Sequence, residues 1–287
     1  MARQDALSIK LQDGVTAASL AEEYGKVIEN VTARAVSVAL KNYNLSGDPA
    51  AGSVEAKRLE NTSVVAYGTA RAAGAGTKPQ IKPVVINLDQ DIEIVTEIEA
   101  KDVKMFGLPN IMQRYSVNHS SAMIRKLDTD FFAEAYAAGT AVTTAATTEA
   151  GKIEDLILKL ETVSNEFVDG VTRDMMGLVL TPTKHSALRL EIDELPAQDN
   201  FYAKGAIGMF HGVPVFVSNH LPKGALQVVD AMVMAFGSVA QPVSISKAYE
   251  DEKIPLSNAH AVELFGSYGT KAVTEDLIFY LGDTYVA

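Results

Sequence analysis

A row of acidic side chains at every second position is the first feature of this sequence that could do chemistry. The even positions between residues 86 and 99 are mostly apolar, and most odd positions carry a carboxylate: Asp89, Asp91, Glu93, Glu97 and Glu99. Two carboxylates can serve as a catalytic acid and base only where their environments differ around one pocket. Period-two spacing instead places all of them on one face of a β-strand. The row therefore predicts a surface and not a catalytic pair.

Two interpretations of that surface remain open. Either the acids form a solvated face that protects a strand from aggregation at its edge, or they meet basic residues of another molecule. Basic residues do lie nearby in the sequence, and copies of this segment could steer one another into register electrostatically. The second interpretation makes the following residues candidates for contacts between subunits: Arg58, Arg71, Lys78, Lys82, Asp89, Asp91 and Glu93.

The other residues of catalytic type have no catalytic or metal-binding spacing. The histidines are not in an H-E-x-x-H arrangement, and the chain has no cysteine for a thiolate site or a disulfide. Gly74 and Gly76 form only a fragment of a dinucleotide-binding fingerprint, followed by Pro79 instead of a helix. Asp128 and Asp130 lie two apart on a predicted helix, so we expect solvated or interface charges there. The sequence thus predicts neither an enzyme nor a cofactor or metal site.

Length and charge favour a folded, acidic protein that does not recognise a nucleic-acid sequence. The chain has 287 residues, and its hydrophobic content of 47% is enough for a sizeable core. The formal net charge of -11 opposes binding to phosphates, which Lys and Arg drive by displacing counterions. That charge still suits a wall that encloses a polyanion without adhering to it. We expect no signal peptide and no membrane span, because no stretch approaches about 18 uninterrupted apolar residues.

The acidic row belongs to a predicted β-hairpin of unusual length. Its second strand, 86–99, keeps its alternation over about 14 residues, or about 45 Å, whereas a typical strand has about five or six residues. Its first strand is expected over 53–67, and the glycine-rich segment 68–80 is expected to form the tip. Isolated two-stranded hairpins are only marginally stable in water. We therefore expect another copy of the chain to stabilise this one.

The rest of the chain alternates helices and short strands. We expect an amphipathic helix over 16–41 that serves as an arm, a long helix over 109–138 and a linker over 140–151. The pattern then predicts a helix over 153–167, a helix from Pro182, and strands over 178–180, 212–219, 231–236, 242–246, 260–265 and 276–281. Helices and strands that are interspersed without a regular βαβ series indicate an α+β fold.

The order of these elements, together with three local segments, resembles the major capsid proteins of tailed bacteriophages with the Hong Kong 97-type fold. The segments are LVLTPTKHSALRL (178–190), GMFHGVPVFVSNHLP (208–222) and FGSYGTKAVTEDLIFYL (265–281). The resemblance covers nearly the whole chain. It implies four parts: an N-terminal arm (1–45), a long E-loop hairpin (46–100), a peripheral domain with a spine helix (101–144 and 236–287) and an axial domain (145–235).

The resemblance also implies a function. Members of this family assemble as pentamers and hexamers into an icosahedral shell around double-stranded DNA, and their E-loops lie on neighbouring subunits. We therefore expect a capsid protein of the virion, assembled in the host cytoplasm, with scaffolding, portal or decoration proteins as further partners. One member links its subunits covalently through Lys and Asn, but no motif here identifies the acceptor Asn or the assisting Glu. The arm begins at Met1, so we expect either a separate scaffolding protein or none.

Two other functions stay open. An encapsulin-type compartment would have the same fold and an inner groove for a cargo peptide, of which no segment here is typical. An unrelated α+β enzyme or binding protein would need a pocket with convergent polar groups and a perturbed acid or base. Assembly into particles would separate both kinds of shell from the third function, and the packaged material, DNA or protein, would separate the two shells.

Overall fold

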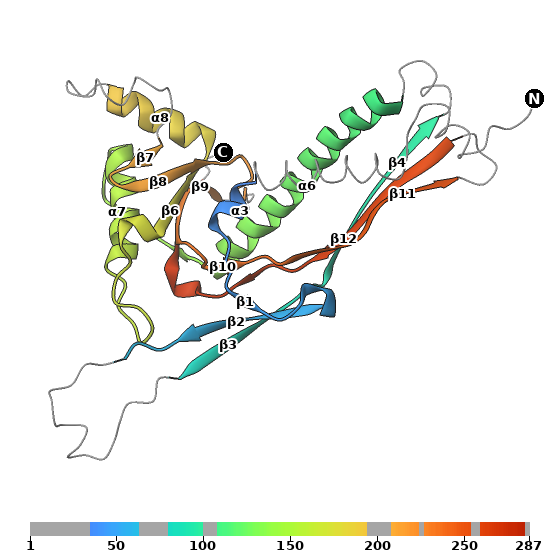
Figure 1. Ribbon diagram of the computed structural model, residues 1–287. Coiled ribbons are helices and arrows are strands. Elements are labelled where there is room, and N and C mark those ends of the chain that lie inside the picture. Colours follow the sequence, from blue (N-terminus) through green and yellow to red (C-terminus); the bar gives the residue numbers. More distant parts are fainter. Residues whose placement is uncertain are drawn as a thin grey trace, which may run out of the picture.

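Helix α6 (Leu108–Ala138) connects two sheets of this protein. The computed structural model describes residues 35–62, 80–99, 108–193, 208–223, 227–253 and 259–284. The C-terminal half of α6 packs on a six-stranded sheet, and its N-terminal half lies along a three-stranded sheet that extends away from the body (Figure 1). The predicted long helix is confirmed. Its buried side chains follow the expected spacing of three and four residues: Met123, Leu127, Phe131 and Ala135.

The six-stranded sheet forms the body. Its order is β5-β14-β9-β6-β8-β7, with parallel pairing of β6 with β8 and of β5 with β14, and antiparallel pairing between the other neighbours. This mixture of pairings and helices confirms the α+β class. The strands are β5 (Thr140–Ala141), β6 (Met176–Leu180), β7 (Met209–Phe210), β8 (Val213–Val217), β9 (Gln227–Ala235) and β14 (Ile278–Thr284).

Both faces of this sheet are buried, because successive residues of a strand point to opposite sides. On one face Met176, Leu178 and Leu180 pack with apolar residues of α7 and α8. On the other face Val179 belongs to a cluster with Phe131 of α6 and with a residue of α3. The covering helices, besides α6, are α3 (Val36–Leu40), α7 (Glu149–Glu161) and α8 (Pro182–Asp193).

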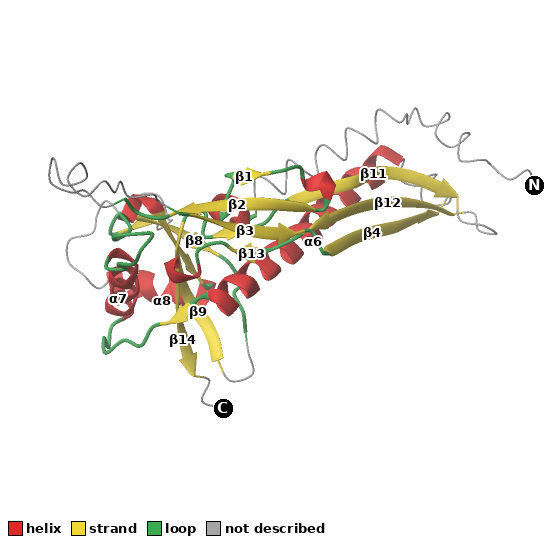
Figure 2. Ribbon diagram, turned by 90° about the horizontal axis from the view of Figure 1, so that it is seen from below, coloured by secondary structure: helices red, strands yellow, loops and turns green. Residues whose placement is uncertain are grey.

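Two further sheets carry the extended parts of the molecule. The first, in the order β11-β12-β4, is the long sheet that Figure 2 shows reaching away from the body with α6 alongside. The second, in the order β1-β2-β3, holds the hairpin, and the short pair β10-β13 lies between it and the body core. The strands of these sheets are β1 (Leu45–Ser46), β2 (Ser53–Leu59), β3 (Ile81–Asn87), β4 (Gln90–Glu99), β10 (Val239–Ala240), β11 (Val243–Lys253), β12 (Ala259–Tyr268) and β13 (Lys271–Ala272). Three short 3-10 helices, labelled η, are η1 (Pro49–Ala51), η2 (Arg173–Met175) and η3 (Glu275–Leu277).

The predicted pairing of 53–67 with 86–99 is wrong. The hairpin consists of β2 and β3, which pair from Ser53 with Asn87 to Leu59 with Ile81. Strand β4 instead pairs with β12, a strand far along the chain. Alternation fixes which face a residue occupies but leaves its partner strand open, so 86–99 could be mistaken for one strand although β3 ends and β4 begins within it.

A close approach between backbones accompanies the break between β3 and β4. The amide of Leu88 donates to the carbonyl of Gly52 at 2.9 Å, which extends the β2–β3 ladder by one position before β4 begins at Gln90. The backbone of Gly269, which follows β12, lies against the same point. A Cβ atom on Gly269 would stand 1.9 Å from the carbonyl oxygen of Asn87, so only glycine fits there.

The sequence analysis misjudged Asp128. This carboxylate is buried, with 2% of its surface exposed, and is not a solvated charge. Its Oδ1 accepts the amide of Ser37 at 3.0 Å, and its Oδ2 accepts the amide of Val36 at 3.3 Å. Since Ala35 offers no side-chain cap, Asp128 caps α3 from another helix. The rest of the predicted helix 16–41, up to residue 34, lies outside the described residues.

The other predicted elements of the body are confirmed with shifted ends. The six strands predicted after residue 152 correspond to β6, β8, β9, β11, β12 and β14. The helix predicted over 153–167 begins at Glu149, capped by the Thr148 hydroxyl, and ends at Glu161. It stops early because the Asn165 side chain accepts the amides of Phe167 and Val168, both at 2.9 Å. None of the helices in the described ranges is both long and apolar enough to cross a membrane.

Substitution of Gly269 tests the close approach. We expect Gly269→Ala to lower the free energy of unfolding by about 1–3 kcal/mol, because the new methyl group must push the Asn87 backbone away. Urea denaturation followed by circular dichroism measures this. Gly208→Ala is the matched control: its Cβ would meet nothing within 4 Å, and we expect a change below about 0.5 kcal/mol. Equal effects of the two substitutions would contradict the proposed contact.

Candidate intersubunit surface

The acidic row lies on one exposed face of β4, as the alternation predicts. Asp91, Glu93, Glu97 and Glu99 on β4 are exposed, as is Asp89 just before the strand, whereas Ile92, Ile94 and Thr96 between them are half-buried. Gln90, at the start of the strand, is exposed as well. Strand β4 is also an edge of its sheet. Within the described ranges, none of the five acids forms an ion pair. Among the described residues, the row thus offers negative charge without an ion-pair partner beside the edge strand of the sheet.

The opposite face of β4 is turned toward α6. The hydroxyl oxygen of Thr96 lies 2.7 Å from Nε2 of His119, which is buried on α6. Burial lowers the pKa of His119. His119 stacks with Tyr115 one turn away, with the two rings 6.1 Å apart. This histidine packs between the helix and the sheet.

The β2–β3 hairpin has one covered face and one open face. Val54, Ala56 and Ile86 are buried on its inner face and pack with Ala240 and Val273. On the outer face three apolar side chains are about half exposed or more: Leu59 (58%), Ile81 (55%) and Val85 (50%). The covered face attaches the hairpin to its own subunit, whereas the sequence analysis expected another copy of the chain to stabilise it. The open face leaves an apolar strip for a partner.

An ion pair holds the distal part of the inner face. Arg58 Nη1 and Nη2 donate to the two carboxylate oxygens of Asp276 in η3, at 2.7 and 2.6 Å. The guanidinium also lies over the Phe167 ring, 4.1 Å from its centre. Asn165 donates to the same carboxylate. Such two-pronged pairing is among the strongest polar contacts that Arg makes.

The predicted contact residues that the structure describes fall into two groups, a basic pair on the hairpin and an acidic group at β4. Arg58 and Lys82 lie opposite each other on the hairpin, Arg58 bound to Asp276 and Lys82 exposed. Asp91 and Glu93 lie on β4, in a different sheet, and the exposed Asp89 directly precedes that strand. The remaining two candidates, Arg71 and Lys78, lie outside the described residues.

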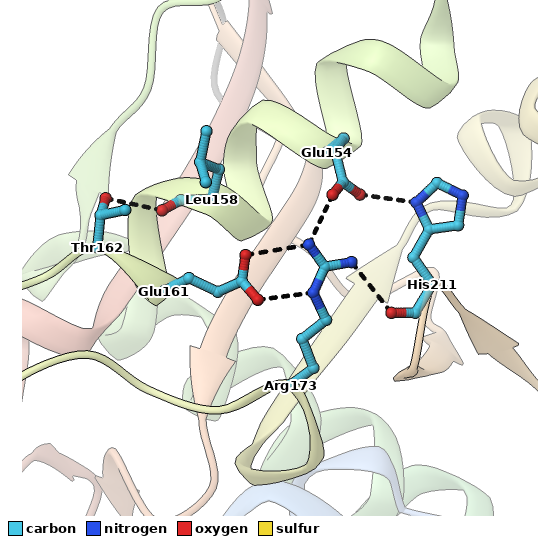
Figure 3. Close-up of polar contacts among 6 residues, drawn as sticks. All are labelled: Glu154, Leu158, Glu161, Thr162, Arg173 and His211. Atoms are coloured by element: carbon cyan, nitrogen blue, oxygen red, sulfur yellow. Dashed lines mark hydrogen bonds and ion pairs between the residues drawn. The ribbon is translucent and has the colours of Figure 1, made fainter.

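A second polar cluster, which the sequence analysis missed, joins α7, η2 and the β7–β8 turn (Figure 3). Arg173 Nε donates to Glu161 at 2.6 Å, its Nη2 donates to Glu154 at 2.6 Å, and its Nη1 donates to the backbone oxygen of His211 at 3.0 Å. Nδ1 of His211 lies 2.8 Å from Glu154. Hydrogen bonds to Glu161 and to Glu154 raise the pKa of Arg173. Burial alone would raise the pKa of Glu154, but hydrogen bonds from Arg173 and His211 outweigh it and leave that pKa lowered.

This cluster is a structural junction. His211 and Gly212 have positive φ angles of 47° and 92°, which close the two-residue turn between β7 and β8. Arg173 and Glu154 attach that turn to α7. The only sequence signal was the spacing of Glu154 and Glu161, seven residues apart on one helical face, which does not identify a partner. Among the described residues, no group of three or more His, Asp or Glu side chains could hold a metal ion.

Comparison with solved structures identifies the fold. A chain of Mycobacterium phage Che8 superposes with a TM-score of 0.59 at 17% identity, over 80% of this chain and 84% of that one. The capsid of a native GTA particle gives a TM-score of 0.60 at 13% identity, over 89% and 91%. This is the fold of phage capsid proteins. The Hong Kong 97-type fold expected from the sequence is thereby confirmed.

The same fold occurs in a virus-like particle. A virus-like particle from Pyrococcus furiosus superposes with a TM-score of 0.54 at 11% identity, over 91% of this chain and 98% of that chain. No family model matches the sequence, and no curated protein does. Sequence identities this low carry the fold but do not carry residue roles from one protein to another.

Acid should remove the contribution of the pair between Arg58 and Asp276. Burial alone would raise the pKa of Asp276, but hydrogen bonds and charge from Arg58 outweigh it and hold that pKa below the ordinary value. A carboxyl group whose folded pKa is depressed stabilises the fold above its unfolded pKa, and this is lost as pH falls through the folded pKa. We expect Asp276→Asn to cost about 1–2 kcal/mol at pH 7.

Urea denaturation between pH 7 and pH 3 measures that dependence. The difference in free energy of unfolding between the unaltered chain and Asp276→Asn should be largest near pH 7 and shrink as pH falls below the ordinary carboxyl pKa, because Asp276 loses its charge only as pH passes through its lowered folded pKa. Asp174→Asn, at an exposed carboxylate, is the control and should cost little at any pH. A difference that stays constant with pH would show that the charge of Asp276 contributes nothing.

Proposed function

We propose that this chain is the major capsid protein of a tailed bacteriophage, a shell subunit without enzymatic activity. Copies would assemble as pentamers and hexamers into an icosahedral shell in the host cytoplasm and become part of the virion. The observation that carries the proposal is the structural likeness to phage capsid proteins over most of the chain. The net charge of -11 supports a wall that encloses double-stranded DNA without adhering to it.

The proposed domains follow the expectation from the sequence with two refinements. The N-terminal arm would occupy 1–45, the E-loop 46–100, the peripheral domain 101–144 and 236–287, and the axial domain 145–235. Strands β5 and β14 come from the peripheral ranges but share the sheet of β6, β8 and β9. Strand β4, at the end of the E-loop range, shares the sheet of β11 and β12. We therefore count β5 and β14 with the axial domain and β4 with the peripheral domain.

The proposed contact between subunits places the hairpin of one copy on the long sheet of the next. The hairpin offers exposed apolar residues on its outer face and the exposed Lys82 on the face that it shares with Arg58, and Arg71 and Lys78 would add basic positions near the tip. The sheet offers Asp89, Asp91 and Glu93 near the edge at β4. Opposite charges would set the register, and the apolar strip would supply most of the affinity. Arg58 already binds Asp276 in its own chain, and its part in this contact stays a prediction.

Electron microscopy and light scattering of the purified protein test the proposal. We expect closed particles of uniform size, formed from subunits of 30.7 kDa. A chain that stays a stable monomer over a wide range of concentration and salt would overturn it.

The likeness to a virus-like particle keeps one alternative open, an encapsulin-type compartment. The contents of particles purified from an infected or expressing cell decide between the two: double-stranded DNA supports the phage capsid, and a specific packaged protein supports the compartment. The third alternative, an α+β enzyme of unrelated fold, has lost its support because the fold is that of capsid proteins.

Neutralisation of two acids on β4 tests the contact. The double variant Asp91→Asn with Glu93→Gln should slow particle formation about tenfold at low salt, and the deficit should shrink as salt screens the charges. The subunit's free energy of unfolding should change by less than about 0.5 kcal/mol, because both side chains are exposed. The double variant Glu166→Gln with Asp174→Asn makes the same charge change at other exposed positions. Assembly kinetics by light scattering measure both, and equal behaviour over a salt series would refute an electrostatic register.

A further inference from the structure

The hairpin is attached to its subunit at two separate points along its inner face. The first is the apolar contact of Val54, Ala56 and Ile86 with the β10–β13 pair. The second is Arg58, two residues beyond Ala56 on the same face, bound to Asp276. A two-stranded ribbon held at one point can pivot about it, whereas a second point of attachment sets its direction.

The second attachment involves more than the ion pair. The amide of Asn61, just beyond β2, donates to the carbonyl of Glu166 at 2.9 Å. The guanidinium of Arg58 covers the Phe167 ring, and its side chain keeps only 13% exposure. Strand β2, the loop that follows α7 and η3 therefore meet at one place, although they are far apart in the sequence.

The loop that receives Arg58 is also held in shape by hydrogen bonds that do not involve Arg58. Asn165 accepts the amides of Phe167 and Val168 with its Oδ1 and donates to Asp276 with its Nδ2. Asp276 is thus positioned by a side chain of the loop as well as by Arg58. Because the acceptor is already ordered, less conformational entropy is lost when Arg58 binds, which favours one defined geometry.

We propose that Arg58 and Asp276 form a clamp that sets the direction in which the long hairpin leaves its own subunit. Arg58 is then a positioning residue inside one chain. The clamp would keep the outer face, with Leu59 and Ile81, aimed at the same place in every copy. The benefit to assembly rests on the proposed function, but the clamp itself is a property of the single subunit.

Hydrogen exchange of the dilute, unassembled subunit tests the clamp. In Arg58→Met we expect the amides of β2 and β3 to exchange about tenfold faster or more, while those of β6 and β9 keep their rates. The matched control is Lys82→Met, because Lys82 lies directly opposite Arg58 on the hairpin but is exposed. The clamp is overturned if Arg58→Met leaves the hairpin rates unchanged or speeds the body strands equally.

A double-mutant cycle separates a clamp from two independent residues. If Arg58 and Asp276 act only through each other, the variant with both Arg58→Met and Asp276→Asn should exchange no faster than Arg58→Met alone. If the two substitutions instead multiply each other's effect on the exchange rate, Arg58 and Asp276 act independently and the pairwise clamp is overturned.

Assembly tests the consequence. We expect Arg58→Met to form particles about tenfold more slowly at high salt than Lys159→Met, which removes one positive charge from an exposed position of α7, away from the hairpin. A loosened hairpin with an unchanged assembly rate would overturn the positioning role. If the unaltered chain formed no particles, the proposed function would fail, and the exchange measurement would still decide whether the clamp exists.

Discussion

The architecture depends on the contact between the Asn87 backbone and Gly269. At this point one extended stretch of chain divides: β3 stays in the hairpin sheet, and β4 enters the sheet of β12. Gly269 follows β12 directly, so the strand that receives β4 also provides the backbone against which the chain turns. Two sheets that point in different directions are thereby fixed to each other. The contact fixes the point at which the hairpin leaves the long sheet, and the attachments of its inner face then hold the hairpin on the body.

Much of the fold could be predicted from local pattern. The α+β class, helix α6 with its buried face and the strands of the body all follow from periodicity, because burial of one face imposes a period on the sequence. The pairing of the strands did not follow from periodicity. The alternation of 86–99 identified its acidic face correctly, yet the same pattern fits any partner strand. Only the pairing with β12, which is distant in the chain, decides that β4 does not belong to the hairpin.

The candidate surface could be predicted only in part, because the sequence shows local exposure but not distant partners. The exposure of Asp91 and Glu93 is a local property of an alternating strand, and the structure confirms it. The binding of Arg58 to Asp276 and the burial of Asp128 were missed, because each depends on a partner more than ninety residues away. A charged residue in a sequence carries no sign of whether its counterion lies in the same chain or in another.

The pairing of β4 with β12 has a consequence for the order of events during synthesis. Residues 90–99 leave the ribosome long before residues 259–268, so β4 must wait for its partner while much of the body is still being made. During that interval both edges of β4 are open, and strands in this condition are prone to join other chains. Its row of carboxylates would keep nascent chains apart by mutual repulsion. The same charges would thus act first against premature association, and translation of the C-terminal strands would set the moment at which a subunit becomes competent to join others.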